Sequence, residues 1–339
     1  MSLTGALNSA SSGLRTTQTL SSITADNVSN AMTPGYTRRS ASVVSTGGSQ
    51  TGATISEIRR DVDASLQRMS RSENGKMARY QALDEGLRSY TAYLGQPGDG
   101  TSTADKFTDF QNSLTTLVNM PSSNGAQSGA VLAAEELAQS VRGAATTLRT
   151  TLSEVDMEIR YEVADVNQAL YQLRDLNIRR LSVEPGTAES AKFGQELDSY
   201  LDQISGIIDT RISFSSSGSV SVYTVGGAAL LEGEYVQDIT FDAGDGTLMA
   251  GQQDITPLKD GVRGLQHGSL AGLSELKRRV IPQFNAQLDE YARGLIQTFE
   301  NADASLAVGQ AGLFTDNGVA FDAINLEGLA SRIAVNDQV

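Results

Sequence analysis

The chain has 339 residues, no cysteine and a single histidine, His267, and its 26 basic and 40 acidic side chains give a net charge of −14. The lack of cysteine excludes disulfides, cysteine-zinc sites and thiol nucleophiles, and one histidine excludes histidine-cluster metal sites. The acidic balance argues against a nucleic-acid partner, and no apolar run reaches the about 18–20 residues of a membrane helix. Because no basic and apolar leader opens the chain, we expect no cleaved Sec signal peptide.

The first predicted element is a helix over residues 3–30, where positions that step alternately by 4 and 3 form a heptad stripe. The stripe comprises Leu3, Leu7, Ala10, Leu14, Thr17, Ser21, Thr24 and Val28, and it is flanked by Leu20 and Ile23. Small polar members bury little apolar surface, so we expect this helix to be ordered only inside a bundle or assembly. The predicted assembly interface is Leu3, Leu7, Ala10, Leu14, Leu20, Ile23 and Val28.

A helix-exit motif follows, because Pro34 forbids further helix and Gly35 suits a tight turn. Asn27 and Asn30 have two open interpretations. They are either caps and turn formers, or an amide pair that fixes register against a neighbouring helix. Residues 1–35 are therefore predicted to be an N-terminal helix region, and residues 36–61 an extended hairpin or loop that turns at Gly47-Gly48.

Helical periodicity dominates residues 62–212, which we predict to be a helical rod domain. An amphipathic face from Val62 to Leu94 is interrupted at Glu73-Asn74-Gly75, and a shorter helix ends before Pro121. A second heptad seam then runs from Val141 to Leu173. A helix of about 50 residues would reach about 75 Å, which is typical of a rod rather than of an ordinary core helix.

The period changes to two after Arg211, so residues 213–265 are predicted to form a small β unit with a hairpin at Gly226-Gly227. A helix returns over residues 266–305 with a kink at Pro282, and residues 306–339 are predicted to be short extended segments. The predicted fold class is mainly α with a small β unit, made of an N-terminal coiled-coil axial helix and an elongated helical-bundle rod domain with inserted β-hairpins.

Chemical motifs are scarce. Asp242-x-x-Asp245-Gly246 and Asp316-Asn317-Gly318 lack the alternating ligands and closing glutamate of a calcium loop, so we interpret both as turns. His267 and the basic run Lys277-Arg278-Arg279 are interpreted as packing or surface groups. We predict no catalytic residues, no metal site and no cofactor, and the chain is not expected to be an enzyme.

The segments Asp26-Asn27-Val28-Ser29-Asn30 and Thr33-Pro34-Gly35-Tyr36-Thr37-Arg38 resemble the N-terminal motif of bacterial flagellar axial proteins. With the long helices that follow, the chain is similar to the flagellar hook-associated protein 1 (FlgK) family, and scattered later stretches strengthen the likeness. These stretches are Gly268 to Leu273, Gln287 to Ala292, Gly312 to Phe314 and Ala330 to Asn336. The family ends in a C-terminal heptad helix that nothing after Val339 supplies, so we expect either a truncated chain or an absent pairing.

The resemblance implies a structural protein at the hook–filament junction that self-assembles through heptad helices and is needed for filament assembly and motility. Asn27, Asn30, Thr33, Pro34, Gly35 and Tyr36 would shape the exit from the inner axial helix. The implied partners are copies of the chain in a ring, hook protein, the next hook-associated junction protein and a flagellar export chaperone, without nucleic acid or membrane insertion. Type III export with an uncleaved N-terminus would place the protein outside the cell, on the flagellum.

Three alternatives remain open from the sequence. The first is another flagellar axial protein of the rod or hook, which would become β-rich soon after Tyr36. The second is a hydrolase that uses Asp238, Asp242 and Asp245, and the third is a cytosolic coiled-coil scaffold, which would need no exit motif at residues 33–36.

Overall fold

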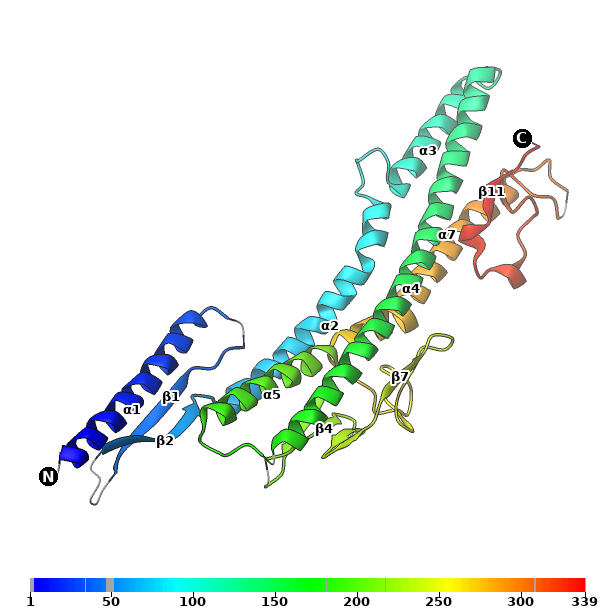
Figure 1. Ribbon diagram of the computed structural model, residues 1–339. Helices are drawn as coiled ribbons and strands as arrows, with labels where there is room; N and C mark the ends of the chain where they lie inside the picture. The colour runs from blue at the N-terminus through cyan, green and yellow to red at the C-terminus, as the bar shows by residue number, and fades with distance from the viewer. Residues whose placement is uncertain are drawn as a thin grey trace. The chain divides into compact units, whose positions relative to one another are not determined.

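The computed structural model describes residues 3–33, 35–46, 52–180, 182–216, 218–307 and 309–338. It is mainly helical with small antiparallel sheets, which confirms the predicted fold class (Figure 1). The chain divides into two compact units. Unit 1 holds Met1–Arg79 and Tyr161–Ala271, and unit 2 holds Tyr80–Arg160 and Gly272–Val339.

In unit 1, helix α1 (Leu3–Ser29) lies along a hairpin of β1 (Arg39–Thr46) and β2 (Gly52–Arg60) (Figure 1). The hairpin is antiparallel with a register shift between Ser42 and Val43, and its predicted Gly47-Gly48 turn lies outside the described residues. Ile23 of α1, Ile58 of β2 and Ala191 of α5 (Ala188–Ile207) form a small apolar cluster that joins the three elements.

Unit 1 also contains two small antiparallel sheets. The first has the order β3-β4-β5-β6, with β3 (Thr210–Phe214), β4 (Val220–Thr224), β5 (Ala229–Glu232) and β6 (Tyr235–Val236). The second has the order β7-β8-β9, with β7 (Ile239–Asp242), β8 (Thr247–Ala250) and β9 (Gln253–Asp254). The predicted hairpin at Gly226-Gly227 is the β4–β5 pair.

Two asparagines of the long helix α4 (Asn124–Arg180) hold these sheets. The Asn177 side chain accepts from the backbone N–H of Val220 at 2.8 Å and donates to the Val220 carbonyl at 2.9 Å. Asn167 makes the same pair of bonds with Ile239, both at 2.8 Å. Each side-chain amide bonds the strand as a neighbouring strand would, so β4 and β7 are fixed to the helix by side chain–backbone hydrogen bonds.

Helix α2 (Ala64–Leu94) contributes residues to both units and runs without a break, so the predicted interruption at Glu73-Asn74-Gly75 is wrong. Gly75 has a packing reason instead, since an added Cβ would lie 2.9 Å from the carbonyl oxygen of Ser205. The first half of α2 also reverses the expected orientation. Leu66 and Met69 are exposed, whereas Arg71 is buried.

Unit 2 contains the later part of α2, the start of α4 up to Arg160, α3 (Thr103–Asn119) and α7 (Ile281–Ala302). Its core gathers apolar side chains of α3, α4 and α7 with Phe314 of β10 (Phe314–Asp316) and Ile333 of β11 (Ile333–Val335). Phe110, Phe299 and Phe314 pack in tilted and edge-to-face pairs with ring centroids 5.3–5.5 Å apart. Two short 3-10 turns, η2 (Ala323–Asn325) and η3 (Leu329–Ser331), lie between β10 and β11 along the chain.

The predicted kink at Pro282 takes the form of a wide helical turn. A π-helix, η1 (Leu276–Val280), lies between α6 (Ser269–Glu275) and α7, and the N–H of Ile281 donates to the carbonyl of Leu276. Proline has no N–H to donate to the preceding turn, so the ladder widens just before it.

Candidate assembly surface

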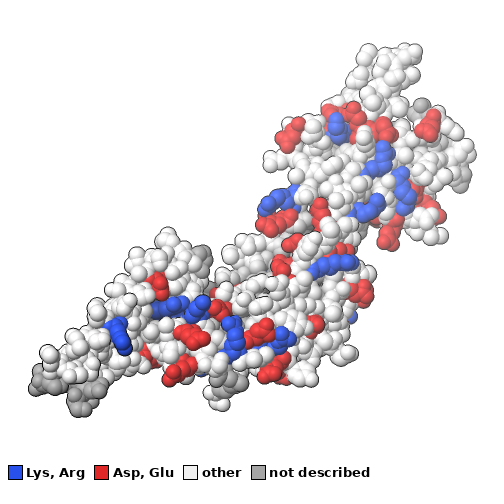
Figure 2. Space-filling view, in the orientation of Figure 1, with Lys and Arg blue, Asp and Glu red and all other residues white. Residues whose placement is uncertain are grey.

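The predicted heptad stripe of α1 is exposed to solvent along its whole length. Its four large apolar members, Leu3, Leu7, Leu14 and Val28, are 69–89% exposed, and the four smaller members are also exposed. We call these eight residues the α1 stripe. In Figure 2 most of the surface over α1 carries no charged atoms. Full burial of one large aliphatic side chain contributes about 1.5–3 kcal/mol, so a partner that covered the stripe would gain several kcal/mol.

The opposite face of α1 is covered by the hairpin, through mainly polar contacts. Thr16 is buried, and its hydroxyl donates to the carbonyl of Ala53 at 2.8 Å. Ile23 is buried and Leu20 is half-buried on the side of α1 away from the stripe. Because these two positions face the hairpin within the chain, the exposed members of the predicted assembly interface are Leu3, Leu7, Ala10, Leu14 and Val28.

Asn27 ties the end of α1 to the start of β1. Its side-chain amide donates to the Arg39 carbonyl at 2.8 Å, and its oxygen accepts from the Arg39 N–H at 2.9 Å. The Tyr36 hydroxyl donates to the same oxygen at 2.9 Å. Within this chain Asn27 therefore acts as a turn former, which is one of the two interpretations left open by the sequence. Tyr36 belongs to the same hydrogen-bonded cluster.

The other residues of the exit motif close the last turn of the helix. Asn30 donates from its side chain to the Asp26 carbonyl at 2.9 Å and accepts from the Thr33 hydroxyl at 3.3 Å. Gly35 adopts a φ of 75°, in the left-handed region that suits glycine. Pro34 lies outside the described residues.

A buried ion network holds the base of the hairpin. Asp198 of α5 accepts from Arg60 at the end of β2 at 2.5 Å, from Arg71 of α2 at 2.9 Å and from Gln67 at 3.1 Å. Arg71 also binds Asp202 at 2.6 Å. Burial alone would raise the pKa of Asp198, but the hydrogen bonds and charge of Arg60, with those of Gln67 and Arg71, lower this pKa below its usual range. The network fixes β2, α2 and α5 to one another.

The carboxylates considered for hydrolysis are engaged in turns and surface contacts. Asp242 accepts from the Gly244 N–H and Asp245 from the Thr247 N–H, both at 2.8 Å. The hydrogen bonds from Thr247 lower the pKa of Asp245, which is the opposite of what a general acid requires. Asp238 bonds the hydroxyl of Tyr171 and raises the pKa of that phenol.

The other charged motifs also have structural partners. Asp316 pairs with Arg332 at 2.7 Å, and Lys277 pairs with Asp156 at 2.7 Å. Among the described residues no group of three His, Cys, Asp or Glu side chains has metal-binding geometry, and no helix there has the length and apolarity of a membrane span.

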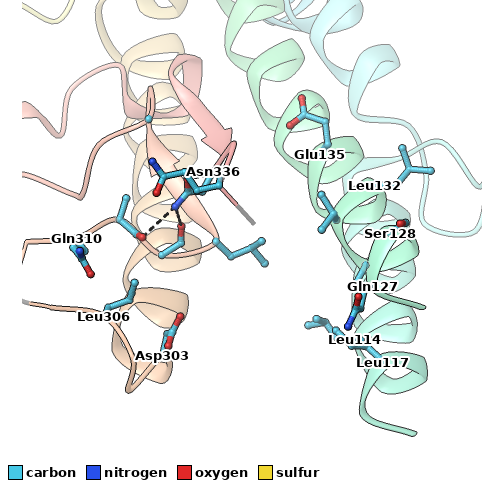
Figure 3. A pocket seen from close by; sticks show the side chains of 17 residues that line it. Leu114, Leu117, Gln127, Ser128, Leu132, Glu135, Asp303, Leu306, Gln310 and Asn336 are labelled. Carbon is cyan, nitrogen blue, oxygen red and sulfur yellow. Dashed lines mark hydrogen bonds between the residues drawn. The ribbon is translucent and has the colours of Figure 1, made fainter. Parts of the chain in front are cut away.

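A groove of about 1170 Å³ lies in unit 2 between two walls (Figure 3). One wall is formed by α3 and α4, including Leu114 and Leu132, and the other by the segment after α7, including Leu306 and Gln310. Asn336 donates to the carbonyls of residues 311 and 312 at 3.3 and 3.1 Å, which holds the second wall in place. Among the described residues, the lining mixes leucines with amides and two acids, without a histidine.

The fold and the α1 stripe therefore define a mainly helical protein with an uncovered helix face. Residues 87–312, about two thirds of the chain, match the family model described as the flagellar hook-associated protein FlgK helical domain. The chain belongs to the FlgK family of flagellar hook-associated proteins.

Relatives and a solved structure agree with this assignment. The chain is 27% identical over 241 residues to flagellar hook-associated protein 1 of Bacillus subtilis, covering 67% of this chain and 47% of that protein. It is 23% identical to the protein of the same name from Escherichia coli, covering 86% and 56%. The chain thus spans about half the length of these relatives.

The fold is similar to the structure of the flagellar hook junction protein FlgK from Burkholderia pseudomallei. The TM-score is 0.59 at 18% identity, over 75% of this chain and 47% of that one.

Sequence reasoning missed two kinds of residue. Asn167 and Asn177 lie within a helical pattern and gave no signal of their strand contacts. The Asp198 network joins residues more than a hundred positions apart along the chain. Only the exit motif carried a local signal, because proline, glycine and asparagine cluster there.

Proposed function

We propose that the chain is a structural component of the bacterial flagellum at the junction of hook and filament. The observation that carries the proposal is the α1 stripe, an uncharged helix face with four large apolar side chains that remains exposed although the opposite face of α1 packs on its own hairpin. Membership in the FlgK family supports the junction role, since the relatives are named for the hook and one is titled a hook junction protein.

In this proposal, residues 1–35 are the axial helix region, residues 36–61 its supporting hairpin, and residues 62–212 with 266–305 the rod domain that carries the β unit of 213–265. The partners are other copies of the chain in a ring, hook protein on one side and the next hook-associated protein on the other. The chain reaches this place by flagellar type III export, with a chaperone, and lies outside the cell.

The test is a pair of matched double variants in a motile strain that carries the full-length gene. Leu7→Asp with Leu14→Asp places two charges in the stripe, and we expect loss of filament assembly and swimming without loss of helicity. Ser11→Asp with Ser22→Asp adds the same two charges to exposed positions beside the stripe and should leave filaments intact. Normal filaments in the stripe variant would refute the proposal.

A further inference from the structure

Asp209 is a buried carboxyl group of unit 1 whose two oxygens are bonded unequally. The residue lies between α5 and β3 and is 8% exposed, and its Oδ2 accepts from the N–H of Gln266 at 3.2 Å. Its Oδ1 is also buried and makes no hydrogen bond within the described part of the chain. Burial disfavours the ionised form, so the pKa of Asp209 is raised above its usual range. A carboxyl group in this position is costly to ionise unless a cation lies beside it.

His267 is the group that can supply this cation. Among the described residues, the basic side chains that line a cavity of about 340 Å³ together with Asp209 are Arg68, Arg71, Arg211 and His267. Arg71 is paired within the Asp198 network, Arg68 donates to a carbonyl of its own helix, and Arg211 is exposed. The charge of His267 favours the ionised form of Asp209, against the larger effect of burial. Histidine gains or loses its charge near neutral pH, so this cation is present only when the imidazole binds a proton.

The pair holds the end of an irregular segment, residues 257–268, which we call the strap. The strap runs from β9 toward α6 as turns and irregular backbone. Near its end, Gln266 is bonded to Asp209, and the N–H of Gly268 donates to the carbonyl of Gly75 in α2 at 2.8 Å. At Gly268 an added Cβ would lie 2.2 Å from the carbonyl oxygen of Ile207, the last residue of α5. The end of the strap is therefore clamped between α2 and α5, and one of its contacts depends on an acidic side chain.

The start of the strap is held less firmly. Leu258 has a φ of 56°, in the left-handed region that strains a leucine, and its side chain is 51% exposed. A segment that stores strain and exposes an apolar side chain opens locally at a low cost in free energy. The contacts at its end therefore decide how long the strap stays closed.

We propose that Asp209 and His267 form a proton-dependent latch for the strap. With a proton on either side chain, the site holds a neutral carboxyl group or a carboxylate beside an imidazolium, and the strap stays closed. With no proton on the pair, Asp209 is a buried anion without a cation, and the strap loosens from α2 and α5. The inference is independent of the proposed function, because it uses no residue of the α1 stripe.

Acidification should close the latch. The folded chain binds the Asp209 proton more tightly than the unfolded chain, in which an aspartate has a pKa of about 3.9. The stability that comes from the protonated form is fully present below this unfolded value and is lost as pH rises through the higher, folded value. The strap should therefore be better protected in mild acid than at about pH 8.

Hydrogen exchange of the full chain, followed by mass spectrometry of peptides from the strap, measures this opening. Protection factors are compared from about pH 5 to about pH 8 after correction for intrinsic exchange, and in wild type they should fall as pH rises. Asp209→Asn keeps the site neutral, so its strap should stay protected across the range, about tenfold more than wild type at about pH 8. Asp242→Asn is the control, since it removes the same charge from an exposed position of β7 and should behave as wild type.

His267→Gln tests the second half of the pair and does not depend on Asp209→Asn folding. Glutamine cannot bind a proton, so this variant should lose protection of the strap at a lower pH than wild type. A structural histidine would instead change protection equally at every pH, which would contradict the latch. The same pH dependence in wild type and Asp209→Asn, or an equal gain in Asp242→Asn, would also overturn the inference.

Discussion

The heptad seam of α4 and the α1 stripe have the same spacing but opposite surroundings. Val141, Leu148, Ile159 and Leu170 of the α4 seam are fully buried, whereas Leu14 at an equivalent place in the α1 stripe is 72% exposed. The periodicity therefore predicted both helices correctly and said nothing about which seam finds its partner inside the chain. The composition of the two seams differs in the sequence, because the α4 seam is almost entirely aliphatic whereas the α1 stripe includes small polar residues.

The two helices are also held by different kinds of contact. α4 packs through apolar side chains into the cores of the units. α1 is held by hydroxyl and amide hydrogen bonds to its hairpin, with only the small Ile23 cluster as an apolar anchor. A helix held in this way keeps its apolar face for another molecule, which is the physical basis of the proposed function.

The largest expected effect comes from truncating the two seams with the same substitution. Leu148→Ala should destabilise the chain by about 4 kcal/mol, because it leaves a cavity in a fully buried site. Leu14→Ala should change the free energy of unfolding by less than about 0.5 kcal/mol, because the side chain is exposed. Urea unfolding followed by circular dichroism measures both. Similar losses for the two variants would mean that α1 is buried in the monomer.

A smaller effect is expected from the ion network beneath the hairpin. Asp198→Asn should cost about 3 kcal/mol, because Arg60 is left largely buried without a counter-ion and Arg71 keeps only the half-exposed Asp202. The pKa of Asp198 is lowered in the folded chain, so its contribution is present above the unfolded pKa of about 3.9 and is lost as pH falls through the folded value.

Unfolding midpoints measured from neutral pH down to about pH 3 test this sign. Wild type should lose stability on acidification more steeply than Asp198→Asn. Asp202→Asn is the control, because Asp202 is about half exposed and contacts only Arg71 in the network. A steeper acid loss in Asp198→Asn than in wild type would contradict the network.

The smallest effect concerns the tether of α1. Asn27→Ala removes three hydrogen bonds to Arg39 and Tyr36 and should destabilise the end of α1 locally by about 2 kcal/mol. Asn30→Ala removes exposed bonds within the last turn and should cost less than about 1 kcal/mol. Hydrogen exchange of the α1 amides separates the two. Equal exchange in both variants would show that the hairpin does not depend on Asn27.

The sequence predicted the element types and the exit motif because their signals are local. Periodicity marks α1 and α4, and Pro34, Gly35 and the asparagines mark the turn. Which face of a helix is buried, in contrast, depends on residues far away in the sequence. Leu66 and Met69 point outward in α2 because Arg71 is drawn inward by Asp198, a residue that no nearby pattern reveals. In the same way, the Ile23 side chain packs against the hairpin and does not lie on the α1 stripe.

The central claim is that the α1 stripe contacts another copy of the chain, and site-directed cross-linking tests it directly. The chain has no cysteine, so Leu14→Cys introduces one thiol in the stripe, and Ser22→Cys introduces one at an exposed position beside it. Assembled flagella that carry Leu14→Cys should yield covalent dimers of the chain on mild oxidation, and those that carry Ser22→Cys should yield far fewer. Equal dimer yields at the two positions would contradict the claim.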